Sequence, residues 1–191
     1  MSTRLTQQDA SFLYGETASG PMHGSMISVV EGEVPFDEIY AHIEARLHLV
    51  PRYRQRLVFV PFNLAHAEWA DDPEFKLENH VLRHQLEPGT DLEDAVSAAL
   101  EVNEALMDRS RPLWAWHVFE GVPGLTLLMH SFHHAMVDGV SGIDITMVLF
   151  DLKADGEVPK SDEKPWAPKP ISSPAERFGA AVREQVLSLI H

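Results

Sequence analysis

The sequence of 191 residues contains no cysteine. A chain without thiols forms no disulfide, has no thiolate nucleophile and offers no zinc site built on sulfur. Basic residues are also scarce, since 15 lysines and arginines stand against 29 carboxylates, for a formal net charge of -14. Because a nucleic-acid partner requires a basic face to meet its phosphates, we expect no such partner.

Long apolar runs are missing as well. The N-terminal sequence MSTRLTQQDASFLYGET lacks the continuous apolar stretch of a signal peptide. No later window approaches the roughly 18 apolar residues that a membrane span needs. Together with the absence of cysteine, this predicts a cytoplasmic chain that is soluble or at most peripheral to a membrane.

What the sequence does contain is ordinary globular composition, 45% hydrophobic and 23% charged. Such a chain folds by burying apolar surface, and its length suits one large domain or slightly more. The run GSMISVVEG, residues 24–32, is apolar and β-branched between glycines, which predicts a buried strand. Residues 35–50 then repeat apolar side chains at helical spacing from Pro35 until Pro51, which predicts an amphipathic helix.

The next segment, PRYRQRLVFV, predicts an extended conformation in which alternation places Arg52, Arg54 and Arg56 on one side. We favour a solvated edge for these arginines over partners for buried acids or for a phosphate-bearing ligand. Further on, Thr90 with Glu93 three residues later is typical of a helix N-cap before a second amphipathic helix. A strand is also expected within EFKLENHVLRH.

Two strands, PLWAWHVFE and LTLLMHSFHH, are separated by the turn sequence GVPG and predict an antiparallel hairpin. Along the first strand, Trp114, Trp116 and Val118 alternate on one apolar face, so we expect them in the core. On the second, Met129 and Phe132 are expected to line a core or a tunnel wall. The pattern of strands and helices as a whole predicts an α/β fold with a mixed sheet flanked by helices.

The C-terminal region changes in composition. After Gly139 helical spacing resumes with Ser141 as a cap, and the stretch 153–174 is rich in proline and polar residues, which predicts a linker. Residues 175–191, with Ser173 as cap, begin a helix that we expect to have no packing partner of its own and to lead to an absent second half. The predicted domain is therefore residues 1–152.

The stretch SFHHAMVDGVSG concentrates reactive side chains. On a strand, His130 and His134 share a face about 13 Å apart at roughly 3.3 Å per residue, while His133 points to the other face, so they cannot hold one metal together. On a helix the three would cluster and a metal would be possible. The short apolar run and the flanking VPG favour the strand, and we expect no metal site.

Adjacent histidines on a strand are more often hydrogen-bonded structural residues than catalysts. Here, however, the strand ends at His134 and turns directly into Asp138 and Gly139, which places an imidazole at the mouth of a bend. Histidine suits general-base catalysis near neutral pH. We do not expect a serine nucleophile at Ser141, because the elbow motif requires glycine where Ile143 stands.

The words HHAMVDG, LTQQDASFLYGET, MHGSMISVVEG, PRYRQRL and DRSRPLWAWHVFEG together resemble the N-terminal half of the bacterial wax ester synthase/diacylglycerol acyltransferase family. HHAMVDG alone matches the HHxxxDG motif of the wider acyl-CoA-dependent acyltransferases. The resemblance implies a chloramphenicol-acetyltransferase-like fold, of which this chain is the first of two similarly folded halves.

The resemblance also implies residue roles. His134 is the expected general base, and His133 is expected to orient its neighbour. Asp138 is expected to hold the bend through an arginine, for which Arg54, Arg56 and Arg111 are candidates. Gly139 is expected to leave room for substrate beside the imidazole.

The reaction implied is transfer of a fatty acyl group from acyl-CoA to a long-chain alcohol or diacylglycerol, with acyl-CoA as co-substrate and no cofactor. The expected partners are those substrates and the C-terminal half of the enzyme, with peripheral association at an inner membrane or lipid droplet. Two alternatives stay open: a related acyltransferase with another alcohol acceptor, and a non-catalytic half-site or assembly fragment.

Overall fold

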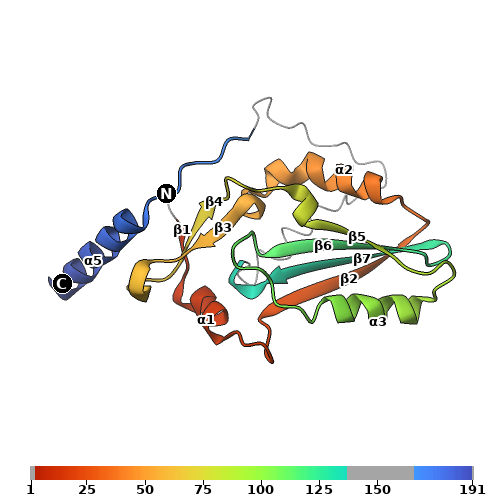
Figure 1. Ribbon diagram of the computed structural model, residues 1–191, viewed down its shortest axis with the longest axis horizontal. Helices are drawn as coiled ribbons and strands as arrows, with labels where there is room; N and C mark the ends of the chain where they lie inside the picture. Colours follow the sequence, from red (N-terminus) through yellow and green to blue (C-terminus); the bar gives the residue numbers. More distant parts are fainter. Residues whose placement is uncertain (1–2, 137–165, 191) are drawn as a thin grey trace.

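The structure is a computed structural model that describes residues 3–136 and 166–190 (Figure 1). In chain order its elements are β1 (Thr3–Arg4), α1 (Gln7–Gly15), β2 (His23–Glu31), α2 (Phe36–Arg46), η1 (Leu47–Leu49), η2 (Pro51–Arg54), β3 (Gln55–Val58), η3 (Pro61–Asn63), β4 (Glu68–Asp71), η4 (Leu77–Asn79), β5 (Val81–Gln85), α3 (Leu92–Val102), β6 (Trp114–Glu120), β7 (Leu125–His133), η5 (His134–Met136) and α5 (Pro174–Ile190). The η elements are short 3₁₀ turns.

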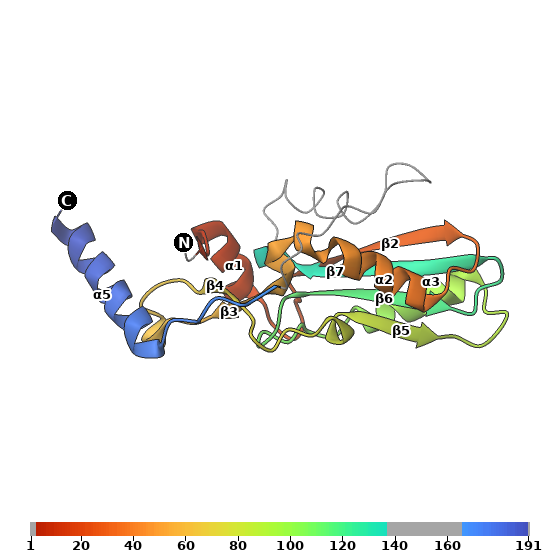
Figure 2. The same ribbon diagram turned by 90° about the horizontal axis from the view of Figure 1, so that it is seen from above.

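The main sheet has four strands in the order β2-β7-β6-β5. Strands β5 and β6 are parallel, whereas the other neighbours are antiparallel, so the sheet is mixed. Helices α2 and α3 lie on opposite sides of it (Figures 1 and 2). The predicted α/β fold with a mixed sheet flanked by helices is confirmed.

The predicted hairpin is also confirmed, with β6 and β7 paired from Trp114 opposite Phe132 onward. Its turn requires glycine at both ends. Gly121 and Gly124 have φ angles of 122° and 68°, and a Cβ at Gly121 would lie 2.8 Å from the Leu86 carbonyl oxygen. Because side chains other than glycine rarely adopt such angles, the sequence GVPG determines where the strand reverses.

The two faces of the sheet carry separate cores. The α2 face buries Trp114, Trp116 and Val118, as their alternation predicts. Phe132 is partly buried against the same cluster. On the α3 face, Met129 packs into a second apolar cluster beneath the helix, so it belongs to the core.

Strand β2 differs from its prediction as a buried strand. Among the described residues it pairs with β7 alone and so forms an edge of the sheet, and Val29 is 47% exposed. The apolar, β-branched composition predicted the strand correctly. It does not predict burial, because composition cannot tell a central strand from an edge strand.

The prediction of an extended conformation for the arginine segment is wrong for its first half. Pro51 begins the turn η2, which includes Arg52 and Arg54, and the strand β3 starts only at Gln55. A proline fixes its own φ and has no N–H to give to a sheet, so it starts a helical turn readily. The three arginines therefore do not share one strand face.

Helix α3 begins one residue later than predicted. Its N-cap is Asp91, whose carboxylate accepts a hydrogen bond from the Asp94 N–H at 2.9 Å. The Thr90 hydroxyl instead donates to the Glu87 carbonyl oxygen at 2.7 Å. Aspartate and threonine both cap helices well. Because the Thr90 hydroxyl is hydrogen-bonded within the preceding turn, Asp91 caps the helix instead.

A small antiparallel sheet, β1-β4-β3, lies beside helix α5 (Figure 1). The predicted cap of α5 is confirmed, because the Ser173 hydroxyl accepts the Glu176 N–H and the Glu176 carboxylate accepts the Ser173 N–H. Contrary to expectation, α5 does pack within the chain: Phe178 meets Phe62 of η3 edge-on and Ala181 is buried.

Several predictions concern parts that the structure does not describe. The expected helix after Gly139 and most of the linker lie outside the described residues, and the division into a domain and a linker stays a prediction. No helix in the described ranges has the length and apolar character needed to cross a membrane.

Candidate functional site

The sheet places His134 at the end of β7. The strand ends at His133, whose N–H donates to the Leu113 carbonyl oxygen at 3.0 Å, and the next N–H, of His134, donates to the Met22 carbonyl oxygen at 2.9 Å. Leu113 precedes β6 and Met22 precedes β2. The two strands that flank β7 therefore fix the point where His134 leaves the sheet.

The imidazole of His134 is exposed. Its ring centroid lies 5.2 Å from that of Phe12 on α1. Gly24 of β2 is also near the ring, and a Cβ there would lie 3.7 Å from His134 Cε1 and 3.8 Å from Nε2. The glycine thus leaves the space of a side chain open beside the ring, which is exposed to solvent.

His133 has the opposite environment, since it is fully buried on the other face of the sheet. The Ala135 N–H donates to its Nδ1 at 3.0 Å, which places the proton of the neutral ring on Nε2. Burial lowers the pKa of His133 to about 4, although the nearby Glu16 carboxylate acts in the opposite direction. The ring is therefore neutral at neutral pH and is closed off from solvent, and its expected orienting role stays a prediction.

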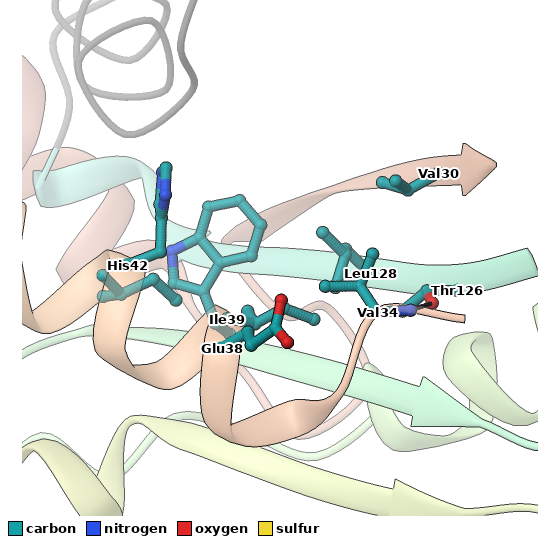
Figure 3. A pocket seen from close by; sticks show the side chains of 9 residues that line it. Val30, Val34, Glu38, Ile39, His42, Thr126 and Leu128 are labelled. Carbon is teal, nitrogen blue, oxygen red and sulfur yellow. Dashed lines mark hydrogen bonds between the residues drawn. The ribbon is translucent and has the colours of Figure 1, made fainter. Parts of the chain in front are cut away.

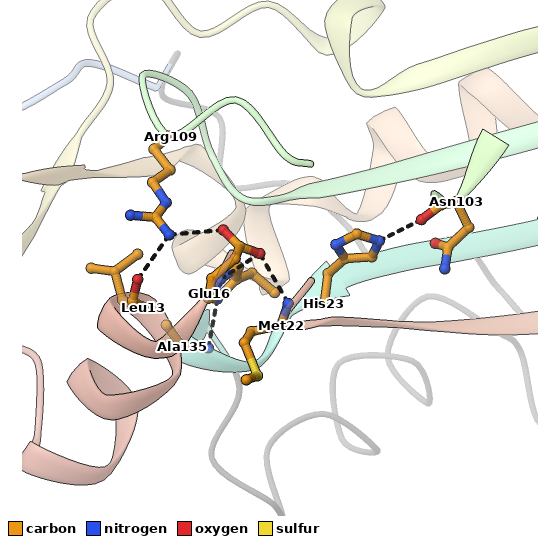
Figure 4. Close-up of polar contacts among 8 residues, drawn as sticks. Leu13, Glu16, Met22, His23, Asn103, Arg109 and Ala135 are labelled. Carbon is orange, nitrogen blue, oxygen red and sulfur yellow. Dashed lines mark hydrogen bonds and ion pairs between the residues drawn. The ribbon is translucent and has the colours of Figure 1, made fainter. Parts of the chain in front are cut away.

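One further residue faces His133 and a second pairs with that residue, and sequence reasoning missed both (Figure 4). Glu16 Oε1 lies 3.4 Å from His133 Nε2, and Arg109 donates to Glu16 Oε2 at 2.8 Å. The same guanidinium nitrogen donates to the Leu13 carbonyl oxygen, and Glu16 also accepts the Met22 N–H at 3.0 Å. Glu16, Arg109 and His133 are called the ionic cluster below.

Glu16 is ionised in this cluster. Its side chain is only 2% exposed. Burial by itself raises the pKa of the Glu16 carboxyl, but hydrogen bonds from the Met22 N–H and from Arg109 outweigh burial and hold the pKa below its ordinary value. A buried carboxylate without such partners would be costly, so Arg109 compensates its charge.

His130 belongs to the core. Its Nε2 lies 2.7 Å from the Tyr53 hydroxyl, and its ring stacks on Trp116 with the centroids 4.5 Å apart. Burial lowers its pKa to about 3. The strand separates His130 from His133, as alternation predicts, and within residues 3–136 and 166–190 no group of three or more His, Asp or Glu side chains is arranged to hold a metal ion.

The predicted site residues Asp138 and Gly139 lie outside the described residues, as does Ser141. The three candidate arginines for Asp138 each have a contact elsewhere. Arg54 lies over Trp166, Arg56 lies 3.4 Å from Asp72, and Arg111 lies 3.4 Å from Asp108. Their ranking for Asp138 stays open.

An apolar pocket lies on the α2 face of the sheet (Figure 3). It has a volume of about 290 Å³ and is lined by Ile39 on α2, Val30 on β2 and Leu128 on β7, among others. Leu128 is six residues before His134, which corresponds to about 20 Å along an extended strand. The pocket is therefore not the place where the imidazole acts.

A smaller cavity of about 200 Å³ lies on the opposite face, and His23, Asn103 and Ser131 line it. His23 Nε2 lies 2.6 Å from the Asn103 carbonyl oxygen (Figure 4). The Ser131 hydroxyl donates to the Asn103 side chain. The apolar pocket and this more polar cavity thus lie on different faces of the sheet.

The arrangement can perform proton transfer at an exposed imidazole whose backbone is held on both sides. A neutral imidazole accepts a proton from a hydroxyl near neutral pH, which is the work of a general base. The 191 residues contain no cysteine that could form an acyl thioester.

Comparison with curated proteins gives relatives of one kind. A Mycobacterium tuberculosis (strain CDC 1551) protein provisionally named a diacylglycerol O-acyltransferase is 33% identical over 187 residues, which cover 95% of this chain and 39% of that protein. Another M. tuberculosis protein with the same type of name is 30% identical and is covered to 63% of its length. The chain thus spans well under half of the first relative.

Solved structures agree in fold. The wax ester synthase/diacylglycerol acyltransferase from Marinobacter aquaeolei is 28% identical with a TM-score of 0.62, over 75% of this chain and 36% of that one. A starter condensation domain of rhizomide synthetase in complex with C8-CoA has a TM-score of 0.61 at 15% identity, over 78% of this chain and 34% of that one. This likeness confirms the fold class.

The sequence itself matches the wax ester synthase/diacylglycerol acyltransferase catalytic domain over residues 5–190, nearly the whole chain. That match includes the His133–His134 pair, the ionic cluster and helix α5. The chain therefore belongs to the wax ester synthase/diacylglycerol acyltransferase catalytic-domain family.

Proposed function

We propose that this chain supplies the general base of an O-acyltransferase that moves a fatty acyl group from acyl-CoA to a long-chain alcohol or diacylglycerol. The products are a wax ester or a triacylglycerol, together with free CoA. Membership of the family and the exposed imidazole of His134 at the end of β7 support this function. Acyl-CoA acts as co-substrate, and the proposal includes no cofactor.

The reaction needs one proton carrier. Neutral His134 takes the proton of the acceptor hydroxyl while its oxygen attacks the thioester carbonyl. The tetrahedral intermediate then expels the CoA thiolate, and the imidazolium returns the proton to the sulfur. One carbon–sulfur bond breaks, one carbon–oxygen ester bond forms, and no acyl-enzyme is required.

The observation that carries the proposal is the contrast between two neighbouring rings. His133 is buried and hydrogen-bonded to Ala135, whereas His134 is open to solvent beside Gly24. Only the second ring can meet a substrate. Asp138 and Gly139 complete the proposed site, Asp138 by holding the bend and Gly139 by leaving room beside the imidazole.

The test is substitution of His134 in the full-length enzyme. We expect His134→Ala to lower turnover by about a hundredfold or more, which is the usual contribution of a general base. Release of CoA from a fatty acyl-CoA in the presence of a long-chain alcohol or diacylglycerol measures it. A control is His84→Gln, which removes an imidazole from β5, at the opposite edge of the sheet. Near-normal turnover of folded His134→Ala would refute the assignment.

The second half of the enzyme belongs to the proposal too. Because this chain spans 39% of one relative, we propose that a C-terminal half contributes the rest of the substrate site. Residues 1–191 alone should then show no transfer until the C-terminal half is added. Peripheral association with an inner membrane or lipid droplet is part of the same proposal, because the substrates are lipids.

The alternative is acyl transfer to another alcohol acceptor, by an enzyme of the same superfamily. The likeness to the condensation domain, at 15% identity, shows a shared fold and does not identify the acceptor. Competition between a long-chain alcohol, a diacylglycerol and a short alcohol for one acyl-CoA separates the two reactions.

A further inference from the structure

We propose that Glu16 and Arg109 are positioning residues that hold the imidazole of His134 in its reactive orientation. The inference rests on the proposed role of His134 as the base. Neither residue touches the ring directly. Both act through the backbone on either side of it and through helix α1.

Arg109 connects the loop before β6 to the end of α1. One guanidinium nitrogen donates to the Leu13 carbonyl oxygen and to Glu16 Oε2, each at 2.8 Å. Leu13 directly follows Phe12, whose ring lies against the exposed imidazole with the centroids 5.2 Å apart. By fixing the last turn of α1, Arg109 fixes the aromatic wall of His134.

Glu16 acts on the strand side. Its carboxylate accepts the Met22 N–H at 3.0 Å, and the Met22 carbonyl oxygen accepts the His134 N–H at 2.9 Å. The peptide groups on either side of Met22 therefore lie between the carboxylate and the backbone of the base. A shift of Glu16 moves the acceptor to which His134 is bonded.

The ionic cluster also restrains the residue after the base. Glu16 Oε1 faces His133 Nε2 at 3.4 Å, which favours the tautomer with its proton on that nitrogen. His133 Nδ1 is then free to accept the Ala135 N–H at 3.0 Å. Through these contacts Glu16 reaches both peptide groups that flank the imidazole of His134.

Burial distinguishes the two members of the pair and suggests the variants. The Glu16 side chain is 2% exposed and that of Arg109 is 36% exposed. Arg109→Gln leaves a buried carboxylate without its cation, which destabilises the fold. Adding Glu16→Gln removes that charge, so the double variant regains stability. Both variants lose the Arg109 hydrogen bond to the Leu13 carbonyl oxygen, and the double variant also loses the carboxylate that faces His133.

The experiment uses the full-length enzyme and measures kcat, KM for acyl-CoA and acceptor, and the thermal unfolding midpoint. The variants are Glu16→Gln, Arg109→Gln, Arg109→Lys and the Glu16→Gln/Arg109→Gln double. The matched control is Arg83→Gln/Glu120→Gln, the same exchange in an ion pair of β5 and β6. His134→Ala is assayed beside them.

We expect the double variant to unfold at a higher temperature than Arg109→Gln, yet to keep a kcat about tenfold or more below the wild type, with both KM values little changed. Arg109→Lys retains the charge, so it should recover part of kcat. The control should keep its kcat.

A double variant that regains both stability and wild-type kcat would overturn the positioning role, because the pair would then be only structural. If the double variant does not fold, a folded Arg109→Gln enzyme with wild-type kcat overturns it equally. These failures leave a low kcat for His134→Ala intact. A wild-type kcat for His134→Ala would instead remove the proposed function, and the positioning role with it.

Discussion

Two adjacent residues of the same type take different roles because a strand alternates. His133 turns into the interior, where burial lowers its pKa and Glu16 faces it, while His134 leaves the sheet at the solvent boundary. The chemical difference between the rings comes from burial and hydrogen bonding alone. At the residue scale, then, position makes one ring a buried neutral group and leaves the other exposed, which is why we propose His134 and not His133 as the base.

Gly24 allows a test of the space beside the base. A Cβ there would meet the His134 and Phe132 rings at 3.7 Å, an ordinary contact, so Gly24→Ala should keep near-normal turnover. Gly24→Val suits a strand but adds two methyl groups beside Nε2, and we expect it to lower kcat by about tenfold or more. Steady-state assays of the full-length variants check this. Equal activity of the two variants would show that the space is not used.

The sequence predicted the histidines of the site but not their supports. His133 and His134 stand out because of their spacing and the strand that carries them. Glu16 and Arg109 are 93 positions apart in the chain, and their contact depends on how α1 meets the loop before β6. No local pattern encodes such a pair. The two sequence motifs that contain Glu16 and Arg109 stood out only through the family resemblance.

At the scale of elements, periodicity predicted which helices and strands form better than it predicted where they begin and end. The hairpin of β6 and β7 and the helices α2 and α3 follow from apolar spacing and from glycine or proline signals, which act locally. The edge position of β2 and the turn η2 before β3 were missed. Strand order and the packing of α5 on η3 depend on distant parts of the chain, so local pattern is insufficient.

The start of α3 provides a test of one such boundary. Asp91 caps the helix through the Asp94 N–H, so Asp91→Ala should lower the free energy of unfolding by about 1 kcal/mol. Thr90→Ala loses only the hydrogen bond to Glu87 in the preceding turn and should cost less. Urea unfolding of both variants measures the difference. A larger loss for Thr90→Ala would return the cap to the residue first predicted.

For the whole molecule, buried imidazoles couple stability to pH. Burial lowers the pKa of His130 to about 3 and those of His117 and His133 to about 4, from an ordinary value of 6.5. Below pH 6.5 these three histidines become protonated in the unfolded chain but stay neutral in the folded chain. The stabilisation from these neutral rings is complete above that value and is lost as pH falls towards the folded-state pKa values.

We therefore expect the urea midpoint of unfolding to fall between pH 7 and pH 5, in the direction set by these three rings. His117→Gln removes one of them and should make the dependence shallower. The midpoints of both proteins at the two pH values provide the measurement. A midpoint that stays constant or rises on acidification would contradict the assigned protonation states.

The sheet holds the exposed imidazole of His134 at the end of a buried strand. The most direct measurement is single-turnover transfer from bound acyl-CoA to an alcohol in full-length His134→Ala, because it separates the chemical step from binding and product release. The account predicts a rate about a hundredfold or more below the wild type with acyl-CoA affinity retained. A wild-type single-turnover rate in the folded variant would contradict it.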